Sequence, residues 1–197
     1  NIINIENLIW NIKKIEIFSE NLKKEKLINF KANKCQLFSI IKNHKLYQLL
    51  DKDLSKSKFF KSRFSTEKNL SFLNKYDLVI NCDPFNFITK RYFSKKISKE
   101  YNSTAYTTII SHDEIINDTA VQIFTKKGPL AFLPISNKKT SIVYSIHNSN
   151  NLEEENIKEL IKDKNFYYKI SEVEKINSFE LKSFNLRSYY HNNILAF

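Results

Sequence analysis

The sequence predicts an α+β fold with a mixed, largely antiparallel sheet and two helices. Three features of the sequence predict this class. Residues 103–146 hold several runs of β-branched and aromatic residues separated by turn residues, as consecutive strands do. Two other stretches repeat apolar residues at the helical period. Residues 76–84 form a short apolar run that is typical of a buried strand in a parallel sheet.

The N-terminal stretch predicts three strands. Residues 12–18 and 26–30 are short runs of apolar and polar residues, and the polar residues between them predict a hairpin. Residues 36–41 are extended in character and lead directly into a helix.

In this first helix, four leucines spaced at i, i+3, i+4 and i+8 form one apolar face: Leu46, Leu49, Leu50 and Leu54. Asn43 is predicted as its N-cap, because an asparagine side chain can accept a hydrogen bond from a free backbone N–H of the first turn. Residues 55–74 are polar and rich in Lys and Ser, which predicts a surface excursion with a weak strand.

The second half of the chain predicts most of the sheet. Turn residues separate four runs with strand composition, at 104–110, 119–125, 130–134 and 140–146. Two further strands are predicted near the end of the chain, at 178–187 and 193–197.

A second helix is predicted between these groups of strands, with Asn151 as its cap. Glutamates fill its first turn at 153–155, where negative charge stabilises the helix dipole. Its core stripe is predicted to consist of Ile157, Leu160 and Ile161.

Gly128 is the single glycine among 197 residues, although a soluble domain averages about 7% glycine. A dinucleotide-binding turn needs several glycines close together, because the backbone must approach the pyrophosphate. The composition therefore excludes a glycine-rich nucleotide loop or a P-loop within this chain.

The net charge of +11 comes from 29 Lys and three Arg, and the lysines are spread along the chain. Arg usually makes the specific phosphate and base contacts, because its planar side chain binds in a bidentate manner. The composition therefore favours a solvated, lysine-rich surface. A basic module that binds nucleic acid or an anionic membrane surface is the alternative.

The two cysteines, Cys35 and Cys82, form neither a disulfide framework nor a zinc motif. The four histidines show no ligand spacing, so we expect no metal site. Sparse cysteine predicts a reducing, cytoplasmic location. No apolar stretch approaches the ~20 residues that span a bilayer.

Gly128 opens the segment with the most specific resemblance to a known family. Residues 128–135 (GPLAFLPI) and the strand at 140–146 resemble the Gly-Pro-Leu-Ala-x-Leu-Pro segment and following strand of the ubiquinone-biosynthesis hydroxylases. These are FAD-dependent monooxygenases similar to para-hydroxybenzoate hydroxylase, and the segment belongs to their middle, substrate-binding domain. Residues 37–46 resemble the family's strand-to-helix passage, and residues 193–197 resemble the strand before its Gly-Asp-Ala-Ala-His flavin motif.

Residues 76–83 resemble the strand that enters the family's Gly-Ala-Asp-Gly-x-x-Ser-x-x-Arg motif, which helps to hold the flavin. On this alignment Asp83 matches the aspartate, so the resemblance implies that Asp83 contacts the cofactor. Lys90, with Arg91 beside it, falls where the motif has its arginine. A turn-capping aspartate before proline is the alternative role for Asp83.

This motif departs from the family pattern at three positions, because Asn81, Pro84 and Phe87 replace its two glycines and its serine. Pro84 also lacks a backbone donor. A family member that keeps the fold without catalysis is therefore a further alternative.

The resemblance implies four segments along the chain. Residues 1–75 begin the substrate-domain sheet and include a helix and connecting segment of the FAD-binding α/β domain. Residues 76–97 hold a strand and the degraded motif of that domain. Residues 98–187 form the β-rich substrate-binding domain, and residues 188–197 return as a strand to the FAD-binding domain.

The resemblance also implies a function, the hydroxylation of an aromatic ring of a polyprenylated ubiquinone precursor. It implies FAD as cofactor, NAD(P)H as reductant, a polyprenylated phenol or quinol as substrate, a ubiquinone-biosynthesis complex as partner and a peripheral position at the inner membrane face. The cofactor carries the chemistry, so the middle domain needs an apolar pocket wall. The candidate wall residues are Tyr106, Phe124, Phe132 and Tyr144, for which packing in the core or on the surface is the alternative.

The chain begins with Asn1, contains no Met and ends in an apolar run. We therefore expect both ends to be cuts in a longer protein. The family's glycine-rich nucleotide loop is expected before Asn1 and its Gly-Asp-Ala-Ala-His motif after Phe197. A fragment between these two flavin motifs is expected to be inactive on its own.

Overall fold

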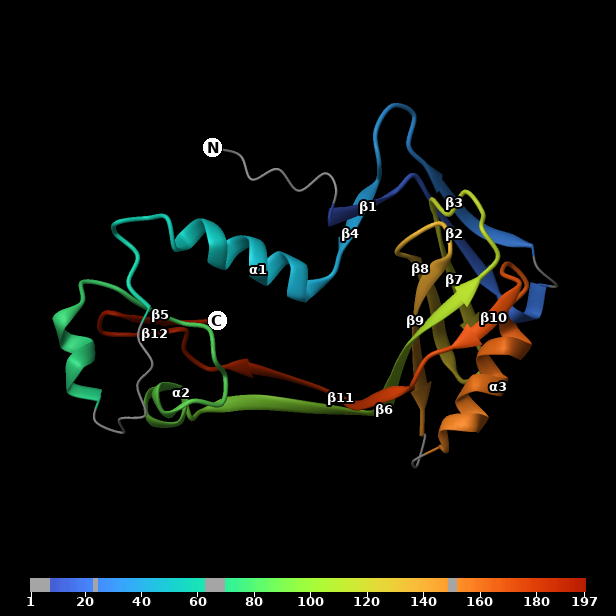
Figure 1. Ribbon diagram of the computed structural model, residues 1–197. Helices are drawn as coiled ribbons and strands as arrows, with labels where there is room; N and C mark the ends of the chain where they lie inside the picture. Colours follow the sequence, from blue (N-terminus) through green and yellow to red (C-terminus); the bar gives the residue numbers. More distant parts are fainter. Residues whose placement is uncertain (1–7, 23–24, 63–69, 149–151) are drawn as a thin grey trace. The chain divides into compact units, whose positions relative to one another are not determined.

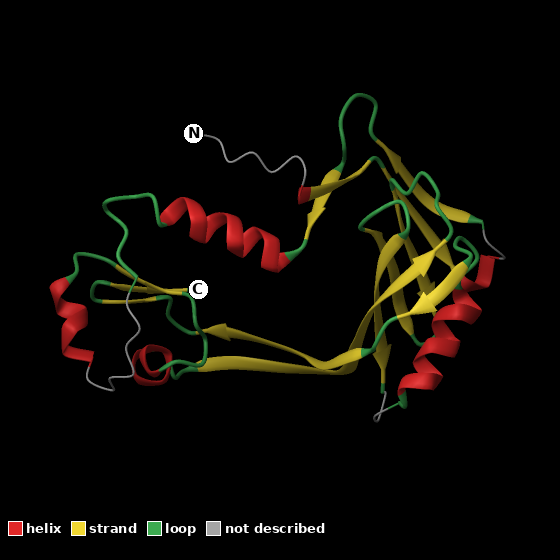
Figure 2. Cartoon of the chain, in the orientation of Figure 1, coloured by secondary structure: helices red, strands yellow, loops and turns green. Residues whose placement is uncertain are grey.

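The structure is a computed structural model that describes residues 8–22, 25–62, 70–148 and 152–197. The chain forms two compact units. Unit 1 comprises residues 1–60 and 102–181, and unit 2 comprises residues 61–101 and 182–197. The predicted α+β class is confirmed, and the helices and strands are drawn in Figures 1 and 2.

In the described chain, strands contain more residues than helices do. In chain order the elements are β1 (Ile9–Ile12), β2 (Lys14–Ser19), the 3₁₀ helix η2 (Glu20–Leu22), β3 (Lys26–Lys31), β4 (Phe38–Ile41), α1 (Asn43–Leu54), the 3₁₀ helix η3 (Leu70–Lys75), β5 (Val79–Asn81), α2 (Phe87–Tyr92), β6 (Lys96–His112), β7 (Thr119–Thr125), β8 (Gly128–Pro134), β9 (Lys139–His147), α3 (Glu154–Lys164), β10 (Ile170–Val173), β11 (Asn177–Leu186), β12 (Tyr190–His191) and β13 (Ile194–Ala196).

Unit 1 is built on a curled sheet in the order β10-β6-β9-β8-β7-β2-β3. Its neighbouring strands pair antiparallel except β2 and β7, which are parallel. The predicted hairpin of residues 12–18 and 26–30 is confirmed as β2 and β3. The four strands predicted between 104 and 146 are confirmed as β6 to β9.

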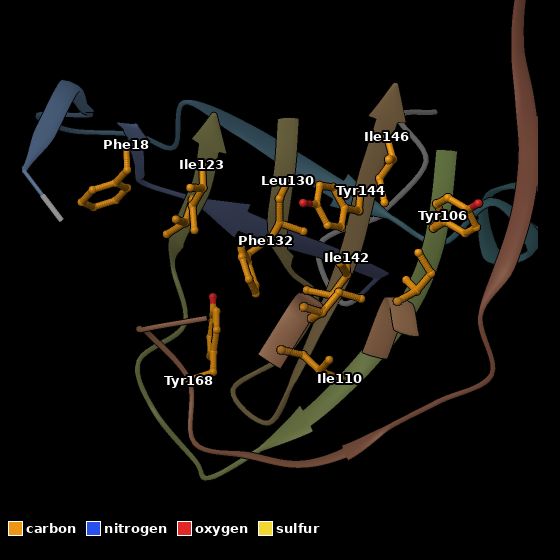
Figure 3. Close-up of a cluster of buried hydrophobic side chains, with 13 residues drawn as sticks. Phe18, Tyr106, Ile110, Ile123, Leu130, Phe132, Ile142, Tyr144, Ile146 and Tyr168 are labelled. Carbon is orange, nitrogen blue, oxygen red and sulfur yellow. The ribbon is translucent and has the colours of Figure 1, made fainter. Parts of the chain in front are cut away.

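One face of this sheet, which we call the covered face, packs against α3. Its central row consists of side chains that lie directly opposite one another across five strands: Tyr106, Tyr144, Leu130, Ile123 and Phe18. These five are at most 4% exposed and form one cluster with Ile157 and Ile161 of α3. Figure 3 shows this row side by side across the strands. The core stripe predicted for the second helix is therefore confirmed.

The opposite face, which we call the open face, carries the alternate residues of the same strands. Its central row runs across six strands through Thr107, Val143, Ala131, Gln122, Ile17 and Ile28. The first five are half-buried, and Ile28 on the edge strand β3 is 48% exposed. Most of this row is apolar, although it faces away from the α3 side of the sheet.

Gly128 starts β8 on the covered face with φ of +139°, which side chains rarely adopt. A Cβ at this position would lie 2.0 Å from the carbonyl oxygen of Ser145 on β9. The single glycine of the chain therefore stands where β8 and β9 approach too closely for any side chain.

The helix predicted from four leucines is confirmed as α1, but its predicted cap is wrong. The N-cap is Lys42, without a side-chain hydrogen bond, and Asn43 is already helical. None of the α1 side chains is fully buried, and Leu50 and Leu54 are more than 40% exposed. The N-cap of α3 is Glu153, and Asn151 lies outside the described residues.

Unit 2 contains a small sheet in the order β12-β13-β5, in which β13 and β5 are parallel. The predicted strands at 76–84 and 193–197 are confirmed as β5 and β13. The prediction that this strand is buried on both faces is wrong, because Ile80 of β5 is 58% exposed. Leu73, Phe93, Ile194 and Ala196 form the core of this unit.

The weak strand predicted within 55–74 is absent from the part of this stretch that the structure describes, where 3₁₀ helix η3 begins at Leu70. Strands β1, β10 and β12 and helix α2 were not predicted. Across the described ranges, no helix is both long enough and apolar enough to cross a membrane.

Candidate functional site

The open face is the part of unit 1 whose chemistry suits a small apolar ligand. Two neighbouring rows of side chains on this face are mostly aliphatic and contain no ionisable group. The central row has Thr107, Val143, Ala131, Gln122 and Ile17, and the next row has Ile109, Ser141, Leu133, Ala120 and Ile15. Ligand sites are commonly lined by apolar groups with a few polar groups that fix orientation. Such a surface can orient an apolar ring, but it cannot donate or remove a proton.

The structure separates the four predicted wall residues. Tyr106, Phe132 and Tyr144 lie together on the covered face, at 4%, 1% and 0% exposure, inside the cluster that includes α3. Tyr144 also shares a hydrogen bond with Thr125, its hydroxyl 3.0 Å from Oγ1. Phe124 lies on the open face and is 47% exposed. A substrate role for the four residues stays a prediction, and three of them have the positions of core packing residues.

A buried polar cluster at one end of the sheet was not foreseen from the sequence. Asn117 lies at its centre, 2% exposed, in the connection between β6 and β7. Its side-chain Nδ2 donates to Thr140 Oγ1 at 2.9 Å and to the Ser136 carbonyl at 2.8 Å, and its Oδ1 accepts from the Tyr168 hydroxyl at 3.0 Å. Its backbone carbonyl accepts from Trp10 Nε1 at 2.6 Å.

His112 completes this cluster. Its Nδ1 donates to the Asp113 carbonyl at 2.8 Å, which leaves Nε2 to accept from Thr140 Oγ1 at 3.0 Å. The imidazole ring lies 4.5 Å from the ring of Tyr168. Burial raises the pKa of Tyr168 to about 12, so the phenol keeps its proton. Because the polar atoms satisfy one another, the cluster fixes the β6–β7 connection and does not present a reactive group.

Asp83 lies in unit 2, in the loop between β5 and α2. The side chain is exposed, and its Oδ1 accepts a hydrogen bond from the Phe85 N–H at 2.8 Å. The Asp83 carbonyl accepts from Thr89 Oγ1 at 2.7 Å and from Asn81 Nδ2 at 3.3 Å. The loop therefore has a fixed conformation that presents an exposed carboxylate just after the carboxyl end of β5, the edge at which α/β sheets bind ligands.

Asn81, one of the residues that depart from the family motif, supports this loop together with Asn86 and Thr89. Asn81 is 4% exposed and donates to Thr89 Oγ1 at 2.7 Å, while Asn86 caps α2 by accepting from the Thr89 N–H at 2.9 Å. Lys90 lies with its Nζ 5.8 Å from the centre of the Phe87 ring. The polar side chains of this turn thus form hydrogen bonds with one another, where the family motif has a glycine-rich turn.

These residues fit one part of FAD and not another. An exposed, ionised carboxylate can accept a hydrogen bond from a sugar or ribityl hydroxyl. A pyrophosphate needs several closely spaced backbone N–H donors, and Pro84 supplies none. The described chain could therefore hold a hydroxyl of the cofactor through Asp83 but offers no cradle for its phosphates.

A hollow of about 340 Å³ lies beside Trp10 in unit 1. It is lined by Leu8, Ile9, Trp10, Ile40, Lys42, Lys45 and Ile135. The lining combines five apolar residues with two lysines at the start of α1. None of the residues predicted as site residues lines it.

A scan against protein-family models and a search of curated proteins find no match for the sequence. Solved structures do share its fold. PqsL of Pseudomonas aeruginosa, described as a probable FAD-dependent monooxygenase, superposes with a TM-score of 0.68 and 11% identity, over 96% of this chain and 60% of PqsL.

Two further flavoproteins show the same fold. HpxO of Klebsiella pneumoniae, solved with FAD and uric acid, gives a TM-score of 0.59 and 11% identity, over 98% of this chain and 57% of HpxO. The flavin-dependent halogenase CmlS gives a TM-score of 0.65 and 12% identity, over 96% of this chain and 40% of CmlS. This chain therefore has the fold of part of the FAD-dependent monooxygenases and spans 40% to 60% of the length of these three proteins.

Proposed function

We propose that this chain is part of an FAD-dependent monooxygenase that hydroxylates the aromatic ring of a polyprenylated ubiquinone precursor. The proposal includes NAD(P)H as reductant and a peripheral position at the inner membrane face, close to a lipid substrate. It also includes inactivity of these 197 residues alone, because a sequence with one glycine has no glycine-rich loop for the phosphates of FAD.

The open face is the observation that carries this proposal. A soluble sheet normally hides an apolar face, yet here one face is covered by α3 while the other remains half-buried and apolar. The fold shared with flavin-dependent monooxygenases supplies a reason for such a face, because an aromatic substrate needs an apolar wall that excludes water. The segment 128–135 that resembles the ubiquinone-biosynthesis hydroxylases forms β8, at the middle of this sheet.

The residues of this chain have distinct roles in the proposed reaction. Bound flavin supplies the oxygen-activating chemistry. Val143, Ala131 and Ile17 form part of the wall against which the substrate ring lies. The covered face, through Tyr144 and Leu130, holds the strands rigid so that the wall keeps its shape. Asp83 in unit 2 accepts a hydrogen bond from a hydroxyl of FAD.

Absorbance spectroscopy tests the proposal. The reading frame that encodes the chain, expressed as the genome carries it, is expected to yield a yellow protein with the visible absorbance of bound flavin. Asp83→Asn keeps an acceptor for the Phe85 N–H but removes the charge, and is expected to weaken FAD binding roughly five- to tenfold. Asp77→Asn, before β5, is the matched control and should leave it unchanged. A folded protein that binds no FAD would contradict the proposal.

A second candidate function is favoured by the Asn81 network. Asn81, which stands where the family motif has its first glycine, forms hydrogen bonds with Asn86 and Thr89, and Asn86 also accepts from the Thr89 N–H. This arrangement suits a family member that has kept the fold and lost catalysis. Normal FAD occupancy together with hydroxylation of a phenol by the purified protein would eliminate this candidate.

A further inference from the structure

Gln122 places an amide group among apolar side chains on the open face. It lies in the central row on β7, directly opposite Ala131 on β8 and beside Ile17 on the parallel strand β2. Residues two positions away on its own strand, Ala120 and Phe124, share its face. A single primary amide is thus surrounded by aliphatic and aromatic neighbours.

Gln122 is half-buried as a residue, and its amide forms no hydrogen bond with any residue in the described ranges. Among the described residues, every fully buried side-chain polar atom has a partner, so the unpaired Gln122 amide remains accessible to solvent or to a ligand. Ala131, directly opposite on β8, places only a methyl group beside this amide. An amide held in such surroundings can bind the single polar group of an otherwise apolar molecule.

From this geometry we infer that the Gln122 amide binds the ring oxygen of a phenolic substrate and sets specificity for it. The inference rests on the proposed function and adds the group that recognises the substrate. The amide oxygen can accept the phenolic O–H, whereas an O-methylated ring offers no such donor. Gln122 is a specificity-determining residue and takes no part in proton transfer.

Thr107, the other polar residue in the same row, lies too far from Gln122 to bind the same ring oxygen. Thr107 lies on β6, three strands away from Gln122, beyond Val143 and Ala131. Adjacent strands are about 4.8 Å apart, so the two polar groups are separated by roughly 14 Å. This distance exceeds the width of one aromatic ring, which makes Thr107 a suitable control position.

The test measures the binding of 4-butylphenol and 4-butylanisole to the protein in the form its gene encodes. Nuclear magnetic resonance titrations follow the methyl groups of Val143, Ala131 and Ile17. Wild type is expected to bind the phenol roughly five- to tenfold more tightly than the anisole, the value of about one hydrogen bond. Gln122→Leu should bind both equally, and Thr107→Val should keep the wild-type preference.

Two outcomes overturn the inference, and they differ in what they say of the proposed function. If both ligands shift the open-face methyls and Gln122→Leu keeps the preference for the phenol, Gln122 is not the recognising group, while the proposed substrate wall stands. If neither ligand shifts those methyls in a correctly folded wild-type protein, the wall itself is wrong and the inference falls with it.

Discussion

The two faces of the unit 1 sheet are both largely apolar, but they differ in solvent exposure and in whether α3 packs against them. On the covered face, Tyr106, Leu130 and Tyr144 are nearly inaccessible and contact the cluster that includes α3. On the open face, Thr107, Ala131 and Val143 come from the same strands, one position away from those residues, and stay half-buried. A shift of one residue along a strand thus separates a structural core from a surface available for binding.

Three of the four aromatic residues predicted as a substrate wall lie on the covered face, and their substrate role stays a prediction. Large aromatic rings bury the most surface and so are concentrated where a sheet meets its covering helix. The open face instead has small and aliphatic side chains, which leave room for a ligand. On this sheet, the large buried side chains stabilise the fold. The smaller, half-buried side chains that alternate with them form the proposed substrate wall.

The same substitution on the two faces gives the largest expected contrast. Phe132→Ala removes a ring that is 1% exposed in the core and should lower the free energy of unfolding by about 3 to 5 kcal/mol. Phe124→Ala, on the open face at 47% exposure, should cost less than about 1 kcal/mol. Urea unfolding measures both, and equal losses would show that the faces are not different.

Gly128→Ala tests the closest strand approach on the covered face. The new Cβ would meet the Ser145 carbonyl oxygen at 2.0 Å, at a backbone φ that alanine rarely adopts. We expect a loss of roughly 2 to 4 kcal/mol from strain and displaced strands. Lys127→Ala, one residue earlier in the turn, is the control and should be nearly neutral in thermal unfolding. A neutral Gly128→Ala would refute the close approach.

Tyr168 is expected to make the stability of the fold depend on pH in the alkaline range. Its pKa is raised to about 12 in the folded chain by burial, above the ordinary value of 10.0. The folded state therefore holds the proton more tightly, and stability that is complete below about pH 10 is lost as pH rises toward 12. The loss approaches roughly 2 to 3 kcal/mol.

Tyr168→Phe separates this effect from the lysines, which titrate in the same range. The variant should be less stable near pH 7 by about 1 to 3 kcal/mol, because Asn117 Oδ1 loses its partner. The difference from wild type should then shrink between about pH 10 and 12. Unfolding curves at several pH values measure it, and a constant difference would contradict the buried position of the phenol.

The smallest expected contrast comes from two valines. Val121→Thr places a hydroxyl on the covered face at a position that is 1% exposed, and should cost about 1 to 2 kcal/mol. Val143→Thr makes the same change at a half-buried position on the open face and should stay within about 0.5 kcal/mol of wild type. Comparable losses would mean that the open face is also a packed core.

Much of the fold could be predicted from local patterns. Alternation and turn residues located β6 to β9, and the spacing of Ile157 and Ile161 located the buried side of α3. Alternation alone did not reveal which face α3 covers, because Ile15, Ile17 and Val143 give the second face apolar character as well. That choice depends on tertiary packing.

Other features were missed because their partners are distant in sequence. The hydrogen bond from Trp10 to Asn117 spans 107 residues, and a lone asparagine in a loop gives no sign of it. Asn43 was predicted as a cap from residue type, although it is already the first helical residue and the N-cap is Lys42. Gln122 was overlooked because one amide within a strand has no motif, and only the strand register shows its apolar neighbours.

The most direct test of the central claim is a methyl nuclear magnetic resonance titration of the protein with 4-butylphenol. We expect shifts for Ala131, Val143 and Ile17 on the open face and none for Ile142, Leu130 and Ile123 on the covered face. Shifts on the covered face, or on neither face, would contradict the claim that the half-buried side of this sheet is the substrate wall.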